Sequence, residues 1–254
     1  MAPPRLSHRL AGVLVGSLVA VLVATVGPPA GATARTTSAV VTTREVVGQS
    51  VDGRPIVAIH RARPGATRVV LVIGCIHGDE QAGMRVVRRL RDRATLPADL
   101  DLWLVPTVNP DGVAADRRTN AHGVDLNRNF TYRWRPSSHG LTWSGPAPLS
   151  EPESVALQAL QERLNPVLTV VFHQPLFSVG STDKSMPTVR AIARGMRLPI
   201  ADLNCTGVCY GTFTGWINAR TAGLGVTVEF ARRVPDWRIG AAAGTVVRVG
   251  SVLV

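Results

Sequence analysis

The residues best suited to chemistry are a histidine and a glutamate that follow a strand-like apolar run. His77 and Glu80 lie three residues apart, directly after residues 69–75. A histidine and a glutamate at a strand end can bind one Zn²⁺ together, with room left for a third ligand and a water molecule. The spacing alone says little, because an HxxE sequence is often a surface turn. His173 and Glu229, which each follow or end a later apolar run, are the candidates to complete the site.

Two further motifs lie between these residues. Residues 109–112 read Asn-Pro-Asp-Gly, and residues 123–130 read Gly-Val-Asp-Leu-Asn-Arg-Asn-Phe. With HxxE before them and the later His and Glu after them, the chain resembles the zinc carboxypeptidase family, typified by carboxypeptidase A. The resemblance covers roughly residues 45–235. The compact length and residues 205–216 are most similar to small bacterial members, which include murein peptide amidases.

The resemblance implies a catalytic centre with one Zn²⁺ per chain. Its ligands would be His77, Glu80 and His173. Glu229 would be the general base that takes a proton from water and returns it to the leaving amine. A salt bridge to a nearby arginine is the alternative role for this carboxylate. Arg118 is the match for the arginine that stabilises the oxyanion, and its neighbour Arg117 is the alternative.

Other matched positions imply substrate contacts. Asn127 and Arg128 would bind the terminal carboxylate of the substrate, since a guanidinium holds a carboxylate through two parallel hydrogen bonds. Tyr210 would close over the substrate. Thr214 would lie at the pocket floor, where no acidic residue is present to select basic side chains. The chain departs from the family at Gln174, where a serine commonly follows the metal-binding histidine.

Strands alternate with helices along the chain. We predict strands at residues 55–62, 68–75, 100–108, 167–172 and 225–230, and helices at 78–93, 150–164 and 186–198. Residues 109–112 have the composition of a turn, and Ser150 to Glu153 read as a capping box. The fold class is therefore α/β: a single domain with a mixed, largely parallel sheet flanked by helices on both faces. Ligands then belong at the carboxyl ends of the strands.

The N-terminus reads as an export signal. Arg5 and Arg9 precede the apolar residues 10–26, and the small residues 30–34 offer cleavage sites. We expect residues 1–34 to be a signal peptide and residues 35–254 the catalytic domain, secreted or associated with the cell wall. After cleavage no stable membrane association is expected. An uncleaved anchor is the alternative, because 17 apolar residues approach the length that spans a bilayer.

The chain is strongly basic, with a formal net charge of +11, and Lys184 is its only lysine. Such a charge suits anionic cell-wall polymers or acidic peptides. Nucleic acid is not expected as a partner, because the arginines are scattered and aromatic residues make up only 5% of the chain. We expect a peptide or peptidoglycan stem peptide as substrate, and a monomer.

Three cysteines are present. Cys205 and Cys209 lie close together in a loop rich in glycine and threonine, so a short disulfide is expected in an oxidising compartment. Metal binding by this pair is the weaker alternative, because no histidine lies nearby. Cys75 ends an apolar run and is expected to be a small buried hydrophobic residue.

These observations predict a secreted zinc metallocarboxypeptidase that hydrolyses an amide bond next to a free carboxylate in peptides. One alternative is a murein peptide amidase that cleaves the γ-D-glutamyl–diaminopimelate bond with the same residues. Another is a non-catalytic cell-wall binding module, which would be expected to lack a ligand or the base. A deacylase of N-acyl amino acids shares HxxE and the later histidine but leaves the other two motifs unexplained.

Overall fold

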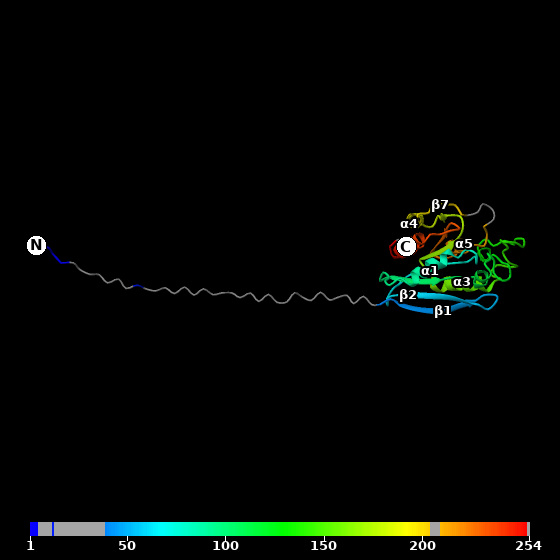
Figure 1. Cartoon of the computed structure of the whole chain (residues 1–254), viewed down its shortest axis with the longest axis horizontal. Helices are drawn as coiled ribbons and strands as arrows, with labels where there is room; N and C mark the ends of the chain where they lie inside the picture. The colour runs from blue at the N-terminus through cyan, green and yellow to red at the C-terminus, as the bar shows by residue number, and fades with distance from the viewer. Residues whose placement is uncertain (5–11, 13–38, 204–208, 253–254) are drawn as a thin grey trace. The chain divides into compact units, whose positions relative to one another are not determined.

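The computed structural model describes residues 1–4, 12, 39–203 and 209–252. The chain divides into two units, Met1–Thr36 and Thr37–Val254, and the helices and strands given below belong to the second (Figure 1). Within the described residues, no helix has both the length and the apolar character needed to cross a membrane. The expected export signal, residues 1–34, lies almost entirely outside the described residues, so it stays a prediction.

The described strands form one mixed sheet in the order β1-β2-β4-β3-β5-β8-β6-β7. They are β1 (Val41–Gln49), β2 (Pro55–Ala62), β3 (Arg68–Ile73), β4 (Leu100–Val105), β5 (Leu168–His173), β6 (Ser178–Gly180), β7 (Ile200–Ala201) and β8 (Leu224–Glu229). The four central strands β4, β3, β5 and β8 run parallel. Antiparallel pairs join β1 to β2, β2 to β4 and β6 to β8. The predicted mixed, largely parallel sheet is confirmed.

Helices cover both faces of this sheet, as predicted. The helices are α1 (Ala82–Arg91), α2 (Pro110–Ala114), α3 (Pro152–Leu164), α4 (Met186–Met196), α5 (Phe213–Arg220), α6 (Asp236–Val252) and the 3₁₀ turn η1 (Leu126–Arg128). Side chains of α1, α4 and α6 enter one hydrophobic core, and those of α3 and α5 enter the other. The predicted strands and helices are present with shifted ends, whereas β1, β6, β7, α5 and α6 were not predicted.

The central strands are apolar on both sides because each side faces a helical layer. In β3, Val70 and Val72 enter the core beneath α1, α4 and α6, whereas Leu71 and Ile73 enter the core beneath α3 and α5. Successive strand residues point to opposite faces, so a continuous apolar run is what a doubly covered strand requires. This packing fixes β3 rigidly and therefore fixes the loop that follows it.

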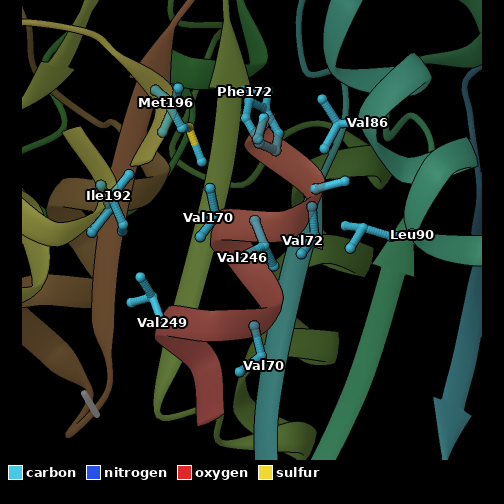
Figure 2. Close-up of a cluster of buried hydrophobic side chains, with 14 of the residues drawn as sticks. Val70, Val72, Val86, Leu90, Val170, Phe172, Ile192, Met196, Val246 and Val249 are labelled. Atoms are coloured by element: carbon cyan, nitrogen blue, oxygen red, sulfur yellow. The ribbon is translucent and has the colours of Figure 1, made fainter. Parts of the chain in front are cut away.

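The C-terminal helix α6 packs across the centre of the sheet. Figure 2 shows Val246 and Val249 of α6 beside Val70 of β3 and Val170 of β5. A side chain at Gly250 would come within 2.8 Å of the Val70 side chain, so glycine lets the helix approach closely. Small residues in α6 thus bring it onto strands whose other ends carry the site residues.

Two local predictions were wrong. Residues 109–112 do not form a simple turn but begin helix α2, because the Asn109 side chain caps it by accepting a hydrogen bond from Gly112 N at 2.8 Å. The capping box is also absent: α3 begins at Pro152 with Glu151 as its N-cap residue, and no side chain caps it. The buried Glu153 side chain instead accepts hydrogen bonds from Val51 N (3.1 Å) and from the Asn120 side chain (3.1 Å).

Candidate active site

The carboxyl ends of the central strands bring the predicted site residues to one edge of the sheet. His173 and Glu229 are the last residues of β5 and β8, and they are direct partners in the parallel register. His77 and Glu80 follow β3, the strand on the other side of β5. Residues 78–81, predicted as helix, form the connection before α1 and place the Glu80 carboxylate beside both histidines.

His77, Glu80 and His173 form a buried cluster. The Nδ1 atoms of the two histidines lie 3.2 Å apart. One Glu80 oxygen lies 3.0 Å from His77 Nδ1, and the other lies 2.9 Å from His173 Nδ1. The three residues are 2%, 7% and 3% exposed, respectively, and their candidate ligand atoms all lie within 4.8 Å of one another. Two imidazole nitrogens and one carboxylate are a donor set that catalytic zinc sites use, so the residues fit this ion.

Asp125 orients one of these candidate ligands, a role that the sequence analysis did not assign. Its Oδ1 lies 3.0 Å from His77 Nε2, which leaves His77 Nδ1 facing the cluster. Carboxylates commonly hold the second nitrogen of a metal-binding histidine in this way. Burial alone would raise the pKa of Asp125, but His77 and Arg118 lower it, so the group stays ionised. Its position inside the GVDLNRNF motif was the one available signal.

We expect Asp125→Asn to weaken zinc binding by about 10- to 100-fold, because the partner of His77 Nε2 loses its charge. Competition with a chromophoric chelator measures the change in zinc Kd. Asp101→Asn is the matched control, since Asp101 makes the same contact with His60 (2.7 Å), which is not part of the cluster. An unchanged zinc Kd in the Asp125 variant would show that this carboxylate does not support the ligand.

The guanidinium of Arg118 contacts the cluster, whereas that of Arg117 bonds elsewhere. Arg118 donates to Glu80 Oε1 at 3.1 Å and to Asp125 Oδ2 at 2.9 Å. Burial by itself lowers the pKa of Arg118, but Asp125 and Glu80 outweigh this and raise it. Arg117 instead donates to the main-chain oxygen of Asn120 at 2.6 Å. The position of the Arg118 guanidinium therefore favours Arg118 over Arg117 as the candidate for stabilising the oxyanion.

Glu229 is 9% exposed and sits beside the cluster. Leu176 N donates to its Oε2 at 3.3 Å, and the ion pairs found among the described residues do not include it. Burial raises its pKa above the ordinary value of a glutamate, although His173 opposes this shift. The alternative of a salt bridge to Arg232 or Arg233 is therefore not seen, and a carboxylate with a raised pKa is suited to accept a proton.

Two of the sequence motifs meet through glycine backbones. A Cβ atom on Gly78 would lie 1.9 Å from the carbonyl carbon of Gly112, so position 78 has no room for a side chain. The carbonyl oxygen of Gly112, in α2, also accepts a hydrogen bond from Arg117 N at 3.0 Å. The HGDE and NPDG motifs are thus packed against each other, and the packing places the turn that carries Arg118 next to Glu80.

Gln174 ties three parts of the site together. Its main-chain N donates to Glu80 Oε2 at 3.1 Å, and its Oε1 accepts from Ala82 N at 2.9 Å. Its Nε2 donates to the carbonyls of Ala231 (2.9 Å) and Arg232 (3.0 Å). The departure from serine at this position therefore links β5, the start of α1 and the segment after β8.

The Asn127–Arg128 pair lies at η1. Asn127 Oδ1 accepts from Phe213 N at 2.9 Å, which fixes the pair against α5. Arg128 donates to Asn127 O at 2.7 Å and to Cys209 Sγ at 3.3 Å, while its Nε is buried with no hydrogen-bond partner among the described residues. Burial lowers the pKa of Arg128. An unpaired buried N–H donor is what an incoming carboxylate can satisfy.

The two remaining predicted substrate contacts lie near this pair. Thr214, on α5, bonds through its hydroxyl to that of Thr227 at 3.0 Å. Tyr210 stacks beneath Arg135, whose guanidinium carbon is 4.0 Å from the ring centroid. No hydrogen bond or ring contact described for Tyr210 reaches the His77–Glu80–His173 cluster, so its closing role stays a prediction.

The cysteines differ in state. Cys209 is disulfide-bonded, whereas Cys75 is free and buried, and burial raises the pKa of its thiol to about 12. Cys205 lies outside the described residues, so its pairing with Cys209 stays a prediction. The high thiol pKa makes Cys75 an unreactive core residue at neutral pH.

Replacing both Cys205 and Cys209 with serine should lower Tm only modestly, because a ring this short constrains the unfolded chain little. Substrate KM should rise, since Cys209 Sγ contacts Arg128. Thiol titration of the unreduced, denatured wild type comes first. One reactive thiol, from Cys75, would support the bridge, and three would rule it out.

Comparisons with known proteins agree with this geometry. The sequence pattern of the family described as zinc carboxypeptidase matches residues 32–175, which include the three candidate ligands but not Glu229. Murein peptide amidase A of Escherichia coli strain K12 is 33% identical over 189 residues, covering 68% of this chain and 75% of the relative.

Solved structures show the same fold. The murein-tripeptide amidase of Escherichia coli O157 superposes with a TM-score of 0.67 at 27% identity, covering 82% of this chain and 91% of that chain. Carboxypeptidase A of Helicoverpa armigera gives a TM-score of 0.68 at 19% identity, covering 83% of this chain and 68% of that chain. The sequence pattern matches more than half of the chain, and the amidase relative is 33% identical and covered over 75% of its length, so the chain belongs to the zinc carboxypeptidase family of peptide-bond hydrolases.

Proposed function

We propose that the protein is a zinc-dependent amidase that cleaves the γ-D-glutamyl–diaminopimelate bond of murein peptides. The observation that carries this proposal is the buried convergence of His77, Glu80 and His173, with Glu229 paired beside them. The similarity to a murein peptide amidase extends over most of both chains. The likeness to carboxypeptidase A, at 19% identity, supports the fold alone.

One zinc ion per chain would be held by the Nδ1 atoms of His77 and His173 and by the Glu80 carboxylate. When bound, zinc supplies a Lewis acid that activates water and polarises a carbonyl. Asp125 keeps the His77 ring in the orientation that this binding needs. The burial of all three ligands excludes bulk water from their polar atoms.

The protein side chains then move the proton and stabilise the charge. Glu229 takes a proton at its carboxylate from the attacking water and delivers it to the leaving amine. Arg118, which already donates to Glu80, presents further N–H groups for the oxygen that gains charge as the tetrahedral intermediate forms. Asn127 and Arg128 bind the carboxylate next to the scissile amide, where the unpaired Arg128 Nε supplies a donor.

Mass spectrometry of products tests the proposal. Zinc-loaded protein is incubated with murein tripeptide and, separately, with ordinary peptides that differ in their C-terminal residue. Release of diaminopimelate from the tripeptide at a far higher kcat/KM is the expected result. Release of C-terminal residues from ordinary peptides alone would replace the amidase assignment with that of a general metallocarboxypeptidase.

We also propose that the protein acts outside the cytoplasm, as a monomer that is secreted or bound to the cell wall. The basic and apolar character of residues 5–26 and the small residues that follow support export. N-terminal sequencing of the mature protein tests this proposal. A start near residue 35 is expected, and an intact N-terminus would instead favour a retained anchor.

A further inference from the structure

One of the two helical layers carries most of the arginines found in helices. The layer formed by α1, α4 and α6 has eight arginines and a single acidic residue, Asp236, within its helices. The opposite layer, formed by α3 and α5, has two arginines and two glutamates. The hydrophobic cores do not require this difference, because no arginine belongs to either core. The positive charge of the helices is therefore concentrated on one face of the sheet.

The apolar side chains of α1, α4 and α6 point inward, which leaves the polar sides of these helices in solvent. Helix α6 packs against both of the others, and Figure 2 shows Val246 of α6 between Ile192 of α4 and Val86 of α1. The remaining surface of α6 includes Gly240 and Gly244, where an added Cβ atom would meet nothing within 4 Å. At these positions, no large side chain of α6 separates the arginines of α1 from those of α4.

Six of the eight arginines form no ion pair with a described residue. Only Arg85 and Arg91 pair with aspartates. Arg248 donates to Thr245 of its own helix at 3.2 Å. In the described part of the chain, four exposed arginines have neither an ion pair nor a side-chain hydrogen bond: Arg88, Arg89, Arg190 and Arg194.

Some of these arginines crowd one another. Arg190 and Arg194 are four residues apart on α4, a spacing at which like charges repel and weaken a helix. The Arg248 guanidinium lies against the next residue of α4, because a Cβ atom on Gly195 would come within 2.7 Å of Arg248 Nη2. An anion bound at this surface would relieve the repulsion.

A second crowded pair surrounds an exposed tryptophan at the start of α6. The Trp237 side chain is 50% exposed. The guanidinium carbons of Arg197 and Arg238 lie 5.4 Å and 4.5 Å from its ring centroid. Burial lowers the pKa of Arg238, and the charge of Arg197 lowers it further. The adjacent acid, Asp236, is already paired with Arg85. The uncompensated positive charge thus extends from α4 onto the first turn of α6.

We propose that the outer surface of α1, α4 and α6 binds a flexible anionic polymer whose repeats are joined by phosphodiesters. This surface, the basic face, comprises Arg89, Arg190, Arg194, Arg197, Arg238 and Arg248. A guanidinium binds the two free oxygens of a phosphodiester through parallel hydrogen bonds. Neighbouring arginines lie about 6 Å apart along a helix and about 8–10 Å apart between helices, which suits a chain that carries one charge in every repeat and bends to follow them.

The observations favour such a polymer over a membrane or a nucleic acid. A helix that binds a membrane presents apolar residues outward, whereas the large exposed hydrophobic residues within these three helices are Trp237 and Val252 alone. One exposed tryptophan cannot stack the successive bases of a single strand, and a rigid duplex would touch a layer of three helices along one line of phosphates. The inference goes beyond the cleavage reaction, because it concerns what holds the protein in place.

Binding of the purified protein to poly(glycerol phosphate) tests the inference. Fluorescence anisotropy across a range of NaCl concentrations gives Kd and the slope of log Kd against log salt. Arg190→Gln combined with Arg194→Gln should raise Kd about tenfold and reduce the slope by roughly 1 to 2, because each lost phosphate contact releases fewer counterions. Tm should not fall, since both side chains are exposed and repel each other.

The matched control removes the same charge from the opposite layer. Arg163 and Arg220 are exposed on α3 and α5. Arg163→Gln combined with Arg220→Gln should change Kd by less than about twofold, because salt screens charges that do not contact the polymer. Phosphatidylglycerol vesicles and duplex DNA, compared at equal phosphate concentration, should both bind more weakly than the polymer.

Several results would overturn the inference. They are no binding of the polymer, an equal loss of affinity in the two double variants, and an unchanged salt slope in the α4 variant. Tighter binding of vesicles or of DNA would also overturn it, and would assign the basic face to a membrane or to nucleic acid. The measurement does not use the cleavage reaction, so its failure is distinguishable from a failure of the proposed function.

Discussion

Replacing Glu229 with glutamine is expected to lower kcat by about 10²- to 10⁴-fold, the range that a general base typically contributes. The amide has nearly the same shape as the carboxylate but cannot accept the proton, so zinc content and the free energy of unfolding should stay close to wild type. Steady-state kinetics, metal analysis and thermal melting measure the three quantities. Glu162→Gln is the control, because Glu162 is exposed on α3 and bonds only to Gln158 among the described residues.

The pH dependence gives the same residue a second test. Burial raises the pKa of Glu229, and the carboxylate must be deprotonated to act as a base. Activity should therefore fall as the pH drops through a pKa above that of an ordinary glutamate, which is about 4.3. This acidic limb of kcat/KM should disappear in the residual activity of the Glu229 variant. A variant within tenfold of wild-type kcat, or one that retains the limb, would exclude Glu229 as the base.

The strands and the order of the site residues were predictable because their signals are local. A strand covered on both faces must be apolar throughout, and residues 68–73 are recognisable for that reason. Parallel strands end at a common edge, so His173 and Glu229 were expected to lie together, and they are partners in the register. Pattern and topology alone supply this much of the site.

The contacts that orient the site were not predictable because they join distant parts of the chain. Asp125 meets His77 across 48 residues, and Gln174 meets Ala82 across 92 residues. The backbone contact between Gly78 and Gly112 is likewise set by tertiary packing. No periodicity encodes such pairs.

Tertiary hydrogen bonds also overrode a local preference, the helix cap predicted at residues 150–153. Ser150 and Glu153 have the spacing of a capping box, but Glu153 is fully buried and is used to bind Val51 N and Asn120. Burial of a carboxylate requires hydrogen-bond partners, and this need outweighs a helix cap worth about 1 kcal/mol. The choice between Arg117 and Arg118 had a similar cause, since it depends on the loop path after Asp116, whose φ is +48°.

Removing either candidate histidine ligand should abolish stoichiometric zinc binding at micromolar protein. Structural zinc sites gain roughly 10–16 kcal/mol from four ligands, so the loss of one ligand should raise the zinc Kd by about 10²-fold or more. His77→Ala and His173→Ala should both show this loss by metal analysis after gel filtration, together with a loss of activity. In wild type, a chelator should lower Tm, because zinc bound only to the folded state stabilises it.

The same chelator should change Tm little in the two variants, which separates metal loss from misfolding. His60→Ala is the matched control: His60 is a histidine paired with a carboxylate, partly exposed and stacked on Trp103, and not a member of the cluster. It should keep full zinc content and the full effect of chelation on Tm. Unchanged zinc stoichiometry in both ligand variants would end the assignment, because a site with two buried imidazoles and one carboxylate cannot lose an imidazole and bind the ion equally well.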